Sequence, residues 1–566
     1  MRTRVKSSVL ATCAGLFMAG CNLAPHYQPP KTPAAGAFKE AVPGAQADTQ
    51  GWKVAEPNDS VIRGKWWELY QDTQLDDLEN RVAISNQTVA GAEANYREAR
   101  ALVSEARASL FPSLNLAPSV VRSRSSASAS STGTASGGSG SGSGSGQGSG
   151  GGGGTGPRTD YTLPLEATYE IDLWGSIRNT VAQSSFTAQA SAANVEAAIL
   201  STQSALAQAY FELRATDEER RILDTTLADY EASLHIVRTL YDNGLASDED
   251  LAEADTQLDS AEAQATDLGV ARAQFEHSIA VLIGVPPSGF SIGVSRFNAS
   301  LPTIPVGVPS DLLERRPDIA AAERQVAAAN AGIGIARAAY FPSLTLNGEA
   351  GFASTGLAQL LDWPNRMWSI GPTLVEPLFD AGLRRAQNEQ ARAEYDATVA
   401  NYRETVLAAF QSVEDNLATL RILSKEVVQQ HDAALAAQRT VKLSVLRFQN
   451  GIDSYVNVIT AQNTFLTSRV AELQVQLRQV TASIVLVNNL GGGWDTSKWS
   501  ETERMAFHPP GAGKGPEAPA ENAGPGVPNP PQQRAAVRPE DLLRQNEEDM
   551  VPAPAPQLGT PPARDP

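Results

Sequence analysis

The sequence predicts an α+β membrane protein made of two similar halves, each with two β-strands and a long helical hairpin. Three observations support this prediction: short motifs that recur at a fixed offset, segments in which apolar and polar residues alternate, and long segments without proline. Alternation is typical of a strand, whereas apolar residues spaced by three and four are typical of a helix.

The composition narrows the class of protein. The chain has 566 residues, of which 42% are hydrophobic, and a formal net charge of −18. A nucleic-acid-binding protein needs a basic surface to neutralise phosphates, so this charge argues against that class. The mean hydropathy of −0.24 argues against many membrane-spanning helices. This mean hydropathy is compatible with a β-barrel, because alternating strands give a weak hydropathy signal.

Residues with catalytic or metal-binding chemistry are sparse. The five histidines are scattered, the two cysteines cannot form a Cys-rich metal site, and no nucleophile elbow or phosphate loop is present. The paired carboxylates are expected at helix starts or on solvated faces. The sequence therefore predicts a protein that is not an enzyme and has no metal or cofactor apart from a covalent lipid.

Residues 1–20 are predicted to be a lipoprotein signal peptide. A basic start precedes the apolar run Val9–Met18, which is too short to span a bilayer. Ala19, Gly20 and Cys21 then resemble a bacterial lipobox, so cleavage before Cys21 and acylation of its thiol are expected. The alternative is an ordinary signal peptide with an incidental cysteine. Asn22, where an aspartate would favour the inner membrane, favours the outer membrane by resemblance to bacterial lipoproteins.

Four motifs recur in the same order, which predicts two internal structural repeats. Three of them recur 207 residues later: Trp174-Gly175 as Ala381-Gly382, Tyr241–Gly244 as Phe448–Gly451, and Ile283-Gly284 as Leu490-Gly491. The motif at 110–114 recurs 230 residues later, at 340–344. The Ser/Gly-rich tract 123–156 accounts for the difference and is expected to form a flexible loop. The predicted repeats are residues 72–284 and 311–491, joined by a proline-rich linker at 285–310.

Each repeat contains a predicted β-hairpin, at 113–171 and at 343–378. Apolar and polar residues alternate around 114–120, 161–171, 344–352 and 368–374. Strands of about 9–11 residues can span a membrane, although soluble hairpins are an alternative. An open four-stranded sheet leaves unpaired backbone groups in lipid, so the barrel must combine several protomers. Periodicity alone leaves 8, 12 and 16 strands open.

Each repeat also contains a predicted helical hairpin, at 176–283 and at 383–490. The descending segment 176–243 has no proline and ends in a 3-4-3-4 apolar seam that is typical of a coiled coil. Gly244 and Gly451 suit the turns at the hairpin tips, and Ser247 and Ser454 are predicted to cap the returning helices.

Helix lengths predict how the shorter helices stack. The 68 residues of 176–243 would span about 102 Å, and the segments 247–283 and 311–340 would together match that length. These two segments are therefore expected to stack end to end beside the long helix. Residues 73–110 and 454–490 are expected to form the equivalent pair.

Several motifs in order resemble the outer-membrane efflux ducts of the TolC superfamily, in particular the OprM and NodT group of lipoproteins. The most specific stretch is Val308-Pro309-Ser310-Asp311-Leu312-Leu313-Glu314-Arg315-Arg316-Pro317-Asp318-Ile319, followed by Ala329-Asn330 and Phe341-Pro342-Ser343-Leu344. Residues 21–27, Trp66-Trp67 and the stretch 72–78 also resemble this family, and the match extends to about Trp494.

The resemblance implies a homotrimer with a 12-stranded barrel in the outer membrane, four strands coming from each protomer. The barrel would continue into a periplasmic α-helical barrel with an equatorial collar, to which the lipidated N-terminal segment 21–71 would contribute. The implied function is a passive exit duct for drugs or other small molecules in a tripartite efflux pump. The implied partners are a periplasmic adaptor of the membrane fusion protein class and an inner-membrane transporter of the resistance-nodulation-division type.

Two other functions are open. One is a TolC-type duct for protein secretion with an ATP-driven exporter, which the lipobox makes less favoured. The other is a structural coiled-coil lipoprotein, against which the alternating strands argue.

The Arg315-Arg316-Pro317-Asp318 run is interpreted as a helix start rather than an anion site. The C-terminal segment 492–566 is proline-rich and is expected to be disordered from about residue 507.

The tips of the helical hairpins are the candidate periplasmic entrance. The family often has acidic residues at the second tip, but here Asn457 and Thr460 stand where aspartates are typical, and only Asp453 is acidic. The first tip instead carries four acids: Asp248, Glu249, Asp250 and Glu253. We expect these acids to make the entrance selective for cations. A capping box between Ser247 and Asp250 is the alternative explanation for part of this acidity.

Overall fold

The computed structural model describes residues 22–32, 38–40, 65–124, 157–298, 301–302, 304 and 316–492. The chain divides into two units, Met1–Phe507 and His508–Pro566, and every described residue belongs to the first. The predictions for Cys21, for residues 125–156 of the Ser/Gly-rich tract and for the tail after residue 492 concern residues outside the described part.

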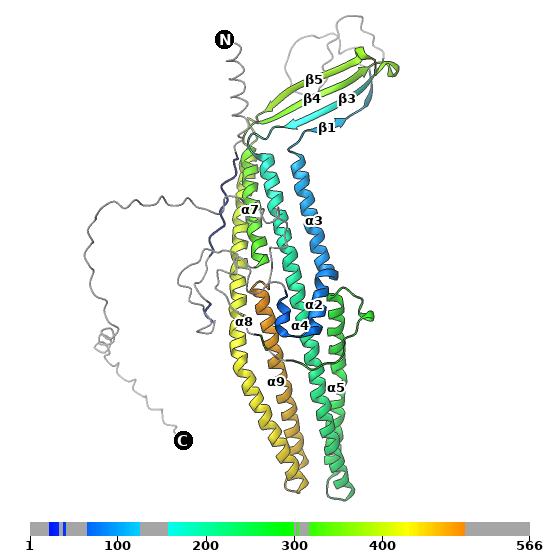
Figure 1. Cartoon of the computed structure of the whole chain (residues 1–566), viewed down its shortest axis with the longest axis vertical. Coiled ribbons are helices and arrows are strands. Elements are labelled where there is room, and N and C mark those ends of the chain that lie inside the picture. The colour runs from blue at the N-terminus through cyan, green and yellow to red at the C-terminus, as the bar shows by residue number, and fades with distance from the viewer. Residues whose placement is uncertain are drawn as a thin grey trace, which may run out of the picture. The chain divides into compact units, whose positions relative to one another are not determined.

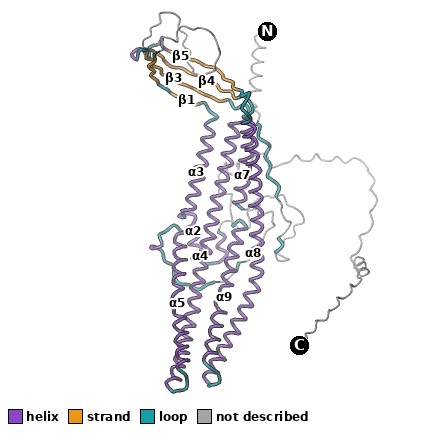
Figure 2. Tube along the Cα trace, turned by 180° about the vertical axis from the view of Figure 1, so that it is seen from behind, coloured by secondary structure: helices purple, strands orange, loops and turns teal. Residues whose placement is uncertain are grey.

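Two long helical hairpins dominate the first unit. The first consists of α4 (Ser176–Asp242) and α5 (Asp248–Leu282), and the second of α8 (Leu383–Gln449) and α9 (Tyr455–Asn489). The hairpins match in length, with descending helices of 67 residues and returning helices of 35. Both tips lie at the end away from the β-sheet (Figures 1 and 2). Within the described residues, no helix is both long and apolar enough to cross a membrane.

The two helices that lead into the β-sheet, α3 (Gln87–Ala108) and α7 (Pro317–Ala338), stack end to end on the returning helices of the hairpins, but in the opposite combination to the predicted one. Helix α3 stands above α5, and α7 stands above α9 (Figure 1). The Asn86 amide donates to the carbonyl of Leu282 at 2.7 Å, and the Arg316 guanidinium donates to the carbonyl of Asn489 at 3.1 Å. The prediction was wrong because α3 and α7 both have 22 residues and both lead upward into a strand, so length and direction do not distinguish them.

The segment predicted as one helix over 73–110 is two helices, α2 (Thr73–Ser85) and α3. Asn86 separates them in an extended conformation, and its side chain accepts hydrogen bonds from the backbone N–H groups of Thr88 and Val89. An asparagine that caps one helix in this way ends the preceding one.

The strands form one antiparallel sheet at the far end of the helices (Figure 1). The strands are β1 (Ser113–Leu116), β2 (Ser119–Ser123), β3 (Arg158–Glu170), β4 (Ser343–Ser354) and β5 (Arg366–Val375). The order is β1-β3-β4-β5, and β2 also pairs with β3. The predicted strand around 114–120 is divided in two at Pro118, because proline has no backbone N–H to donate. One edge of the sheet is formed by β1 and β2, and the other by β5.

The register of the sheet separates an apolar face from a polar face. Leu165 lies opposite Ala350, which lies opposite Trp368, whereas Glu166 lies opposite Glu349, which lies opposite Ser369. The other large apolar residues that share the face of Leu165 are Leu114, Leu116, Val120, Tyr161, Leu163, Tyr169, Leu344, Leu346, Phe352, Ile370 and Leu374. Many of these side chains are exposed to solvent, and Trp368 has 74% of its surface exposed.

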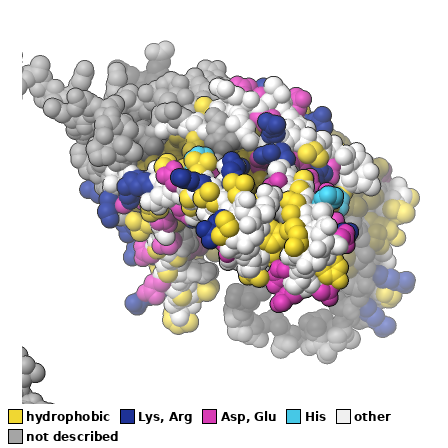
Figure 3. All heavy atoms as spheres, turned by 90° about the horizontal axis from the view of Figure 1, so that it is seen from below, with side chains coloured by type: hydrophobic (Ala, Val, Ile, Leu, Met, Phe, Trp, Pro, Cys, Tyr) yellow, Lys and Arg dark blue, Asp and Glu magenta, His cyan; other side chains and the backbone are white. Residues whose placement is uncertain are grey.

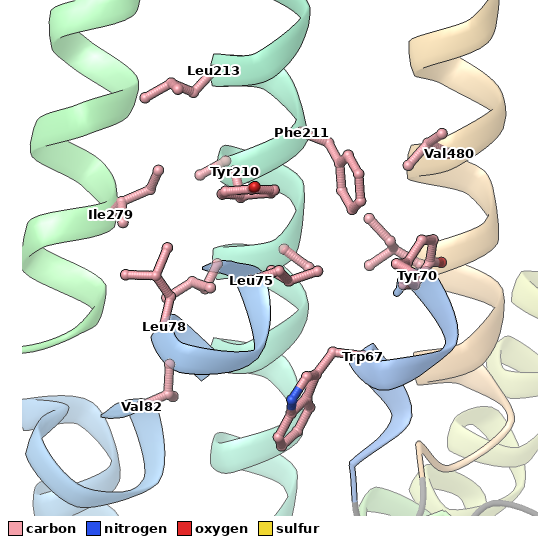
Figure 4. Close-up of a cluster of buried hydrophobic side chains, with 14 of the residues drawn as sticks. Trp67, Tyr70, Leu75, Leu78, Val82, Tyr210, Phe211, Leu213, Ile279 and Val480 are labelled. Carbon is pink, nitrogen blue, oxygen red and sulfur yellow. The ribbon is translucent and has the colours of Figure 1, made fainter. Parts of the chain in front are cut away.

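The main apolar core lies where the upper and lower helices meet. A short 3-10 helix, η1 (Trp66–Tyr70), and α2 place their apolar side chains among α4, α5 and α9 (Figure 4). The side chains labelled in Figure 4 are Trp67, Tyr70, Leu75, Leu78, Val82, Tyr210, Phe211, Leu213, Ile279 and Val480. The Tyr70 hydroxyl is also 2.7 Å from the Ser483 hydroxyl, so η1 is bonded to α9. This core holds the two hairpins together at the middle of the helical part.

Candidate functional site at the helical hairpin tips

The turn at each hairpin tip is made by a glycine in the left-handed conformation. Gly244 has φ +72° and Gly451 has φ +69°. After each glycine the chain closes a backbone hydrogen bond to the end of the descending helix, from Leu245 to Leu240 and from Ile452 to Arg447. A left-handed residue of this kind is the usual way to end a helix and reverse the chain.

The two returning helices begin differently. Ser247 and Asp250 form a capping box: the Ser247 hydroxyl accepts from the Asp250 N–H at 3.1 Å, and the Asp250 carboxylate accepts from the Ser247 N–H at 3.0 Å. Ser454 occupies the same place before α9, but its side chain forms no capping hydrogen bond, so that prediction was wrong. The second tip is held instead by Asp453, which accepts from Arg447 at 3.0 Å and from Asn457 at 2.6 Å. The Arg447 hydrogen bond is the main reason that the pKa of Asp453 is lowered.

The four acids of the first tip have different environments. Asp248 and Glu249 are exposed, whereas Asp250 is held in the capping box. Glu253 is only partly exposed, and its Oε2 is buried with no hydrogen-bond partner in the described part of the chain. Seen from the tips, the molecule presents both acidic and basic side chains (Figure 3). Of these four acids, Asp248 and Glu249 are the two that are most exposed to solvent.

A cleft of about 660 Å³ lies between α5 and α9 near the tips. Glu249 and Glu253 line it from one side and Thr460 from the other. Gln257 and Asn463 exchange two hydrogen bonds of 3.2 Å across it and so fix the spacing of the two hairpins. The candidate entrance residues are thus divided, because Asp453 and Asn457 belong to the second turn rather than to this cleft.

Tyr455, which the sequence did not single out, joins the two hairpins below this cleft. Its side chain is 1% exposed and belongs to an apolar cluster with Val237, Ala254 and Val458. Burial, assisted by the nearby Tyr230, Glu253 and Asp250, raises the pKa of Tyr455 to about 12. Its phenol is therefore neutral throughout the physiological range. A 3-4 apolar pattern across both α4 and α9 was the only sequence signal for this contact.

A buried charge network at mid-height was also missed from the sequence. Asp217 accepts from Arg214 at 3.0 Å and from Arg272 at 2.8 Å, and Arg272 also bonds Glu276 at 3.1 Å. The two arginines donate to the backbone carbonyls of Gly293 and Ile292, both at 2.7 Å. The expectation that the paired carboxylates lie on solvated faces or at helix starts was wrong here. The network fastens the segment after α5 to both α4 and α5.

The N-terminal segment 22–32 lies along α7 and α8. Asn330 donates to the carbonyl of Pro25 at 2.9 Å, and Arg337 donates to the carbonyl of Leu23 at 3.4 Å. Arg403 of α8 donates to the carbonyl of Lys31 at 3.4 Å. Leu23 therefore lies beside the last turn of α7, a few residues before β4 begins.

Arg316 and Asp318 form the start of α7. Pro317 occupies its first turn, and Asp318 accepts two hydrogen bonds from the Arg316 guanidinium, at 2.7 and 3.0 Å. These contacts agree with the interpretation of this run as a helix start. Among the described residues, no group of three or more histidine, cysteine, aspartate or glutamate side chains could hold a metal ion.

Comparisons with known proteins place these features in context. The family described as "Outer membrane efflux protein" matches residues 78–285 and 308–492. The chain is 30% identical over 495 residues to the probable efflux pump outer membrane protein TtgC of Pseudomonas putida, covering 86% of this chain and 96% of that protein. It is 28% identical over 436 residues to the pyoverdine export outer membrane protein OpmQ of Pseudomonas aeruginosa, covering 77% and 88%. Its structure resembles the outer-membrane channel OprN with a TM-score of 0.72 and 26% identity, covering 84% of this chain and 100% of that chain.

Proposed function

Because this chain belongs to the outer membrane efflux protein family, is located in the outer membrane and acts there as an exit duct, we propose that three copies assemble into one passive channel. The protein works with other components of an efflux pump. We propose that these are a periplasmic adaptor and an inner-membrane transporter of the resistance-nodulation-division type. The cargo we propose is a drug or another small molecule, in line with the pyoverdine named for one relative.

The observation that carries the channel proposal is the β-sheet with one apolar face and two unpaired edges. In lipid, unpaired backbone groups are costly, so the β1/β2 edge must pair with another strand, and so must the β5 edge. Three copies with four membrane-spanning segments each would close a 12-stranded barrel with the apolar face toward lipid and the polar face inward. The helical hairpins would continue it as an α-helical barrel in the periplasm. Their equal lengths support the proposal that the two halves are structural repeats.

We also propose that the chain is lipidated on Cys21. Leu23 is held at the end of α7 beside the start of the β-sheet, so a lipid on Cys21 would be within reach of the membrane surface. Labelling cells with radioactive palmitate tests this, and the Cys21→Ser variant should lose the label while still forming trimers. Equal labelling of the variant and the unmodified protein would contradict lipidation.

Reconstitution tests the channel itself. The purified full chain should migrate as a trimer after chemical cross-linking and should form water-filled channels in planar bilayers. A monomeric protein that never raises the conductance of a bilayer would overturn the proposal. The structural alternative of a coiled-coil lipoprotein would predict this negative result.

A further inference from the structure

The apolar face of the β-sheet has two charged residues among the described residues, and both are arginines. Arg122 of β2 lies opposite Thr159, two residues beyond the apolar pair of Val120 and Tyr161. Arg366 of β5 lies opposite Phe352. Alternate residues of a strand point to the same face of the sheet, and so do directly paired residues. Both arginines therefore lie on the apolar face. Both lie near the end of the sheet that is farther from the helices, because Arg122 pairs near the start of β3 and Arg366 begins β5, and these strands lead into α4 and α8 at their other ends. They lie on opposite edges of the sheet.

Neither arginine is neutralised by a carboxylate in the described part of the chain. The guanidinium carbon of Arg366 lies 4.4 Å from the ring centroid of Trp363, and that tryptophan is 72% exposed. By contrast Arg158, at the same end of the sheet but on the polar face, is paired with Asp160 at 2.7 Å. An arginine stacked on an aromatic ring still has its N–H groups free to bind an anion in the plane of the guanidinium.

The position of Arg366 relative to the apolar face matches a membrane boundary. The nine intervals from Arg366 to Val375 span about 30 Å along the strand. With a strand tilt of about 40°, this corresponds to about 23 Å of membrane thickness, close to the apolar band of about 25 Å in membrane barrels. Tryptophan is also enriched at such boundaries, where Trp363 would then lie.

We propose that Arg122 and Arg366 bind the phosphate groups of an anionic glycolipid in the outer leaflet of the outer membrane. This inference rests on the proposed function, because it requires that the apolar face of the sheet be in contact with lipid. The guanidinium groups would hold the phosphates by charge-assisted, bidentate hydrogen bonds, while Trp368 and Ile370 below them contact the acyl chains. The sheet would thereby prefer a phosphorylated lipid on its outer side.

Binding of lipid A to the full-length protein in detergent tests this proposal. Native mass spectrometry would measure the bound fraction for lipid A with two phosphates and for the same lipid after removal of its phosphates. The double variant Arg122→Gln/Arg366→Gln should bind phosphorylated lipid A roughly tenfold more weakly, whereas Arg158→Gln, the matched control, should bind as the unmodified protein does. Arg366→Lys should fall between, because it keeps the charge and loses the planar stacking.

Three outcomes would overturn the proposal: unchanged binding by the double variant, equal weakening by Arg158→Gln, or equal binding of the lipid with and without phosphates. If the double variant loses its strand signal in circular dichroism, the single Arg366→Lys and Arg366→Gln variants decide the question by their order of affinity. Channel conductance separates this inference from the proposed function. A variant protein that conducts normally and binds lipid A normally contradicts only the lipid site, whereas an unmodified protein without conductance contradicts the channel.

Discussion

Ala24 of the N-terminal segment lies directly against Gly334 of α7, with no room for a side chain between them. A β-carbon added to Gly334 would come within 2.7 Å of the Ala24 β-carbon and within 2.5 Å of the Asn179 amide nitrogen. Real side chains do not approach so closely, so the glycine allows the N-terminal segment to contact the helix. The contact connects the segment that follows the proposed lipid anchor to the helical part of the protein.

The first prediction is that Gly334→Ala releases the N-terminal segment from α7. Alanine is the better helix former by about 0.5–1 kcal/mol, so the substitution should preserve the helix itself. It should, however, increase hydrogen exchange and protease cleavage within residues 22–32. Gly332→Ala is a matched control, because among the described residues its β-carbon would meet only the Gln183 amide nitrogen, at 3.5 Å. Equal protection of the segment in both variants would show that the close contact is unimportant.

The second prediction concerns the buried charge network. Asp217→Ala leaves Arg214 and Arg272 without their shared carboxylate, and an uncompensated buried charge costs roughly 3–5 kcal/mol of stability. Asp224→Ala removes an exposed i,i+4 partner of Arg220 on the same helix and should cost less than about 1 kcal/mol. Urea unfolding followed by the helical circular dichroism signal measures both. Similar losses in the two variants would contradict the importance of burial here.

Much of the fold could be predicted from the sequence because it depends on local patterns. The period of apolar residues and the tip glycines Gly244 and Gly451 determine the hairpins within one or two residues. The stacking of α3 on α5 could not be predicted, since it depends on a side-chain contact between Asn86 and Leu282, which are far apart in the chain. The helix break at Asn86 does have a local sequence signal, because asparagine is a strong N-cap residue.

The candidate site was harder to predict than the fold. The sequence shows that the first tip is acidic. It does not show which carboxylates face solvent, which join the capping box and which line the cleft, because this depends on how each helix is rotated about its axis. Arg214 and Asp217 have the spacing of an ordinary i,i+3 pair on a helix surface, but Gln74 of α2, Arg272 of α5 and the carbonyl of Gly293 all contact them in the folded protein. Long-range packing of this kind leaves no local pattern.

The third prediction is a pH dependence that arises from Glu79 of α2. Glu79 is fully buried, neither carboxylate oxygen has a hydrogen-bond partner among the described residues, and burial raises its pKa well above the usual value. Its folded pKa exceeds its unfolded pKa, so its contribution to stability is complete below the unfolded pKa of about 4.3 and is lost as the pH rises through the folded pKa.

Glutamine does not ionise, so the free energy of unfolding of Glu79→Gln should fall less than that of the unmodified protein as the pH rises above about 4.3. Thermal unfolding measured from acid to alkaline pH should show a flatter profile for this variant than for the unmodified protein. Glu93→Gln, at an exposed position of α3, should leave the profile unchanged. Parallel profiles for Glu79→Gln and the unmodified protein would show that Glu79 does not titrate with folding.

The fourth prediction tests which face of the sheet meets lipid. Ile370 and Ser369 are neighbours on β5 that point to opposite faces, and Ile370 shares the face of Leu374. A lysine on the lipid face of a membrane barrel costs roughly 2–4 kcal/mol near the membrane centre. Ile370→Lys should therefore reduce the amount of protein in the outer-membrane fraction, whereas Ser369→Lys should be tolerated. The opposite order would place the polar face toward lipid.

The fifth prediction concerns ion selectivity at the first hairpin tip. Asp248 and Glu249 are exposed at the tip of the first helical hairpin, where the proposed α-helical barrel would open into the periplasm. Asp250 is needed for the capping box, and Glu253 is partly buried. In a trimer, the exposed carboxylates would be repeated around one opening. Like charges around a narrow opening attract cations, and salt screens them over about 10 Å at 0.1 M.

Asp248→Asn/Glu249→Gln should therefore lower the preference for cations without unfolding the tip. Reversal potentials in planar bilayers with a salt gradient measure this preference, and the shift should be larger at low salt. Asp259→Asn/Glu262→Gln changes the charge by the same amount at exposed positions of α5, and it lies more than a turn farther from the tip. It should therefore have a smaller effect. If the reversal potential of Asp248→Asn/Glu249→Gln equals that of the unmodified protein, the two carboxylates serve only to offset the dipole at the start of α5.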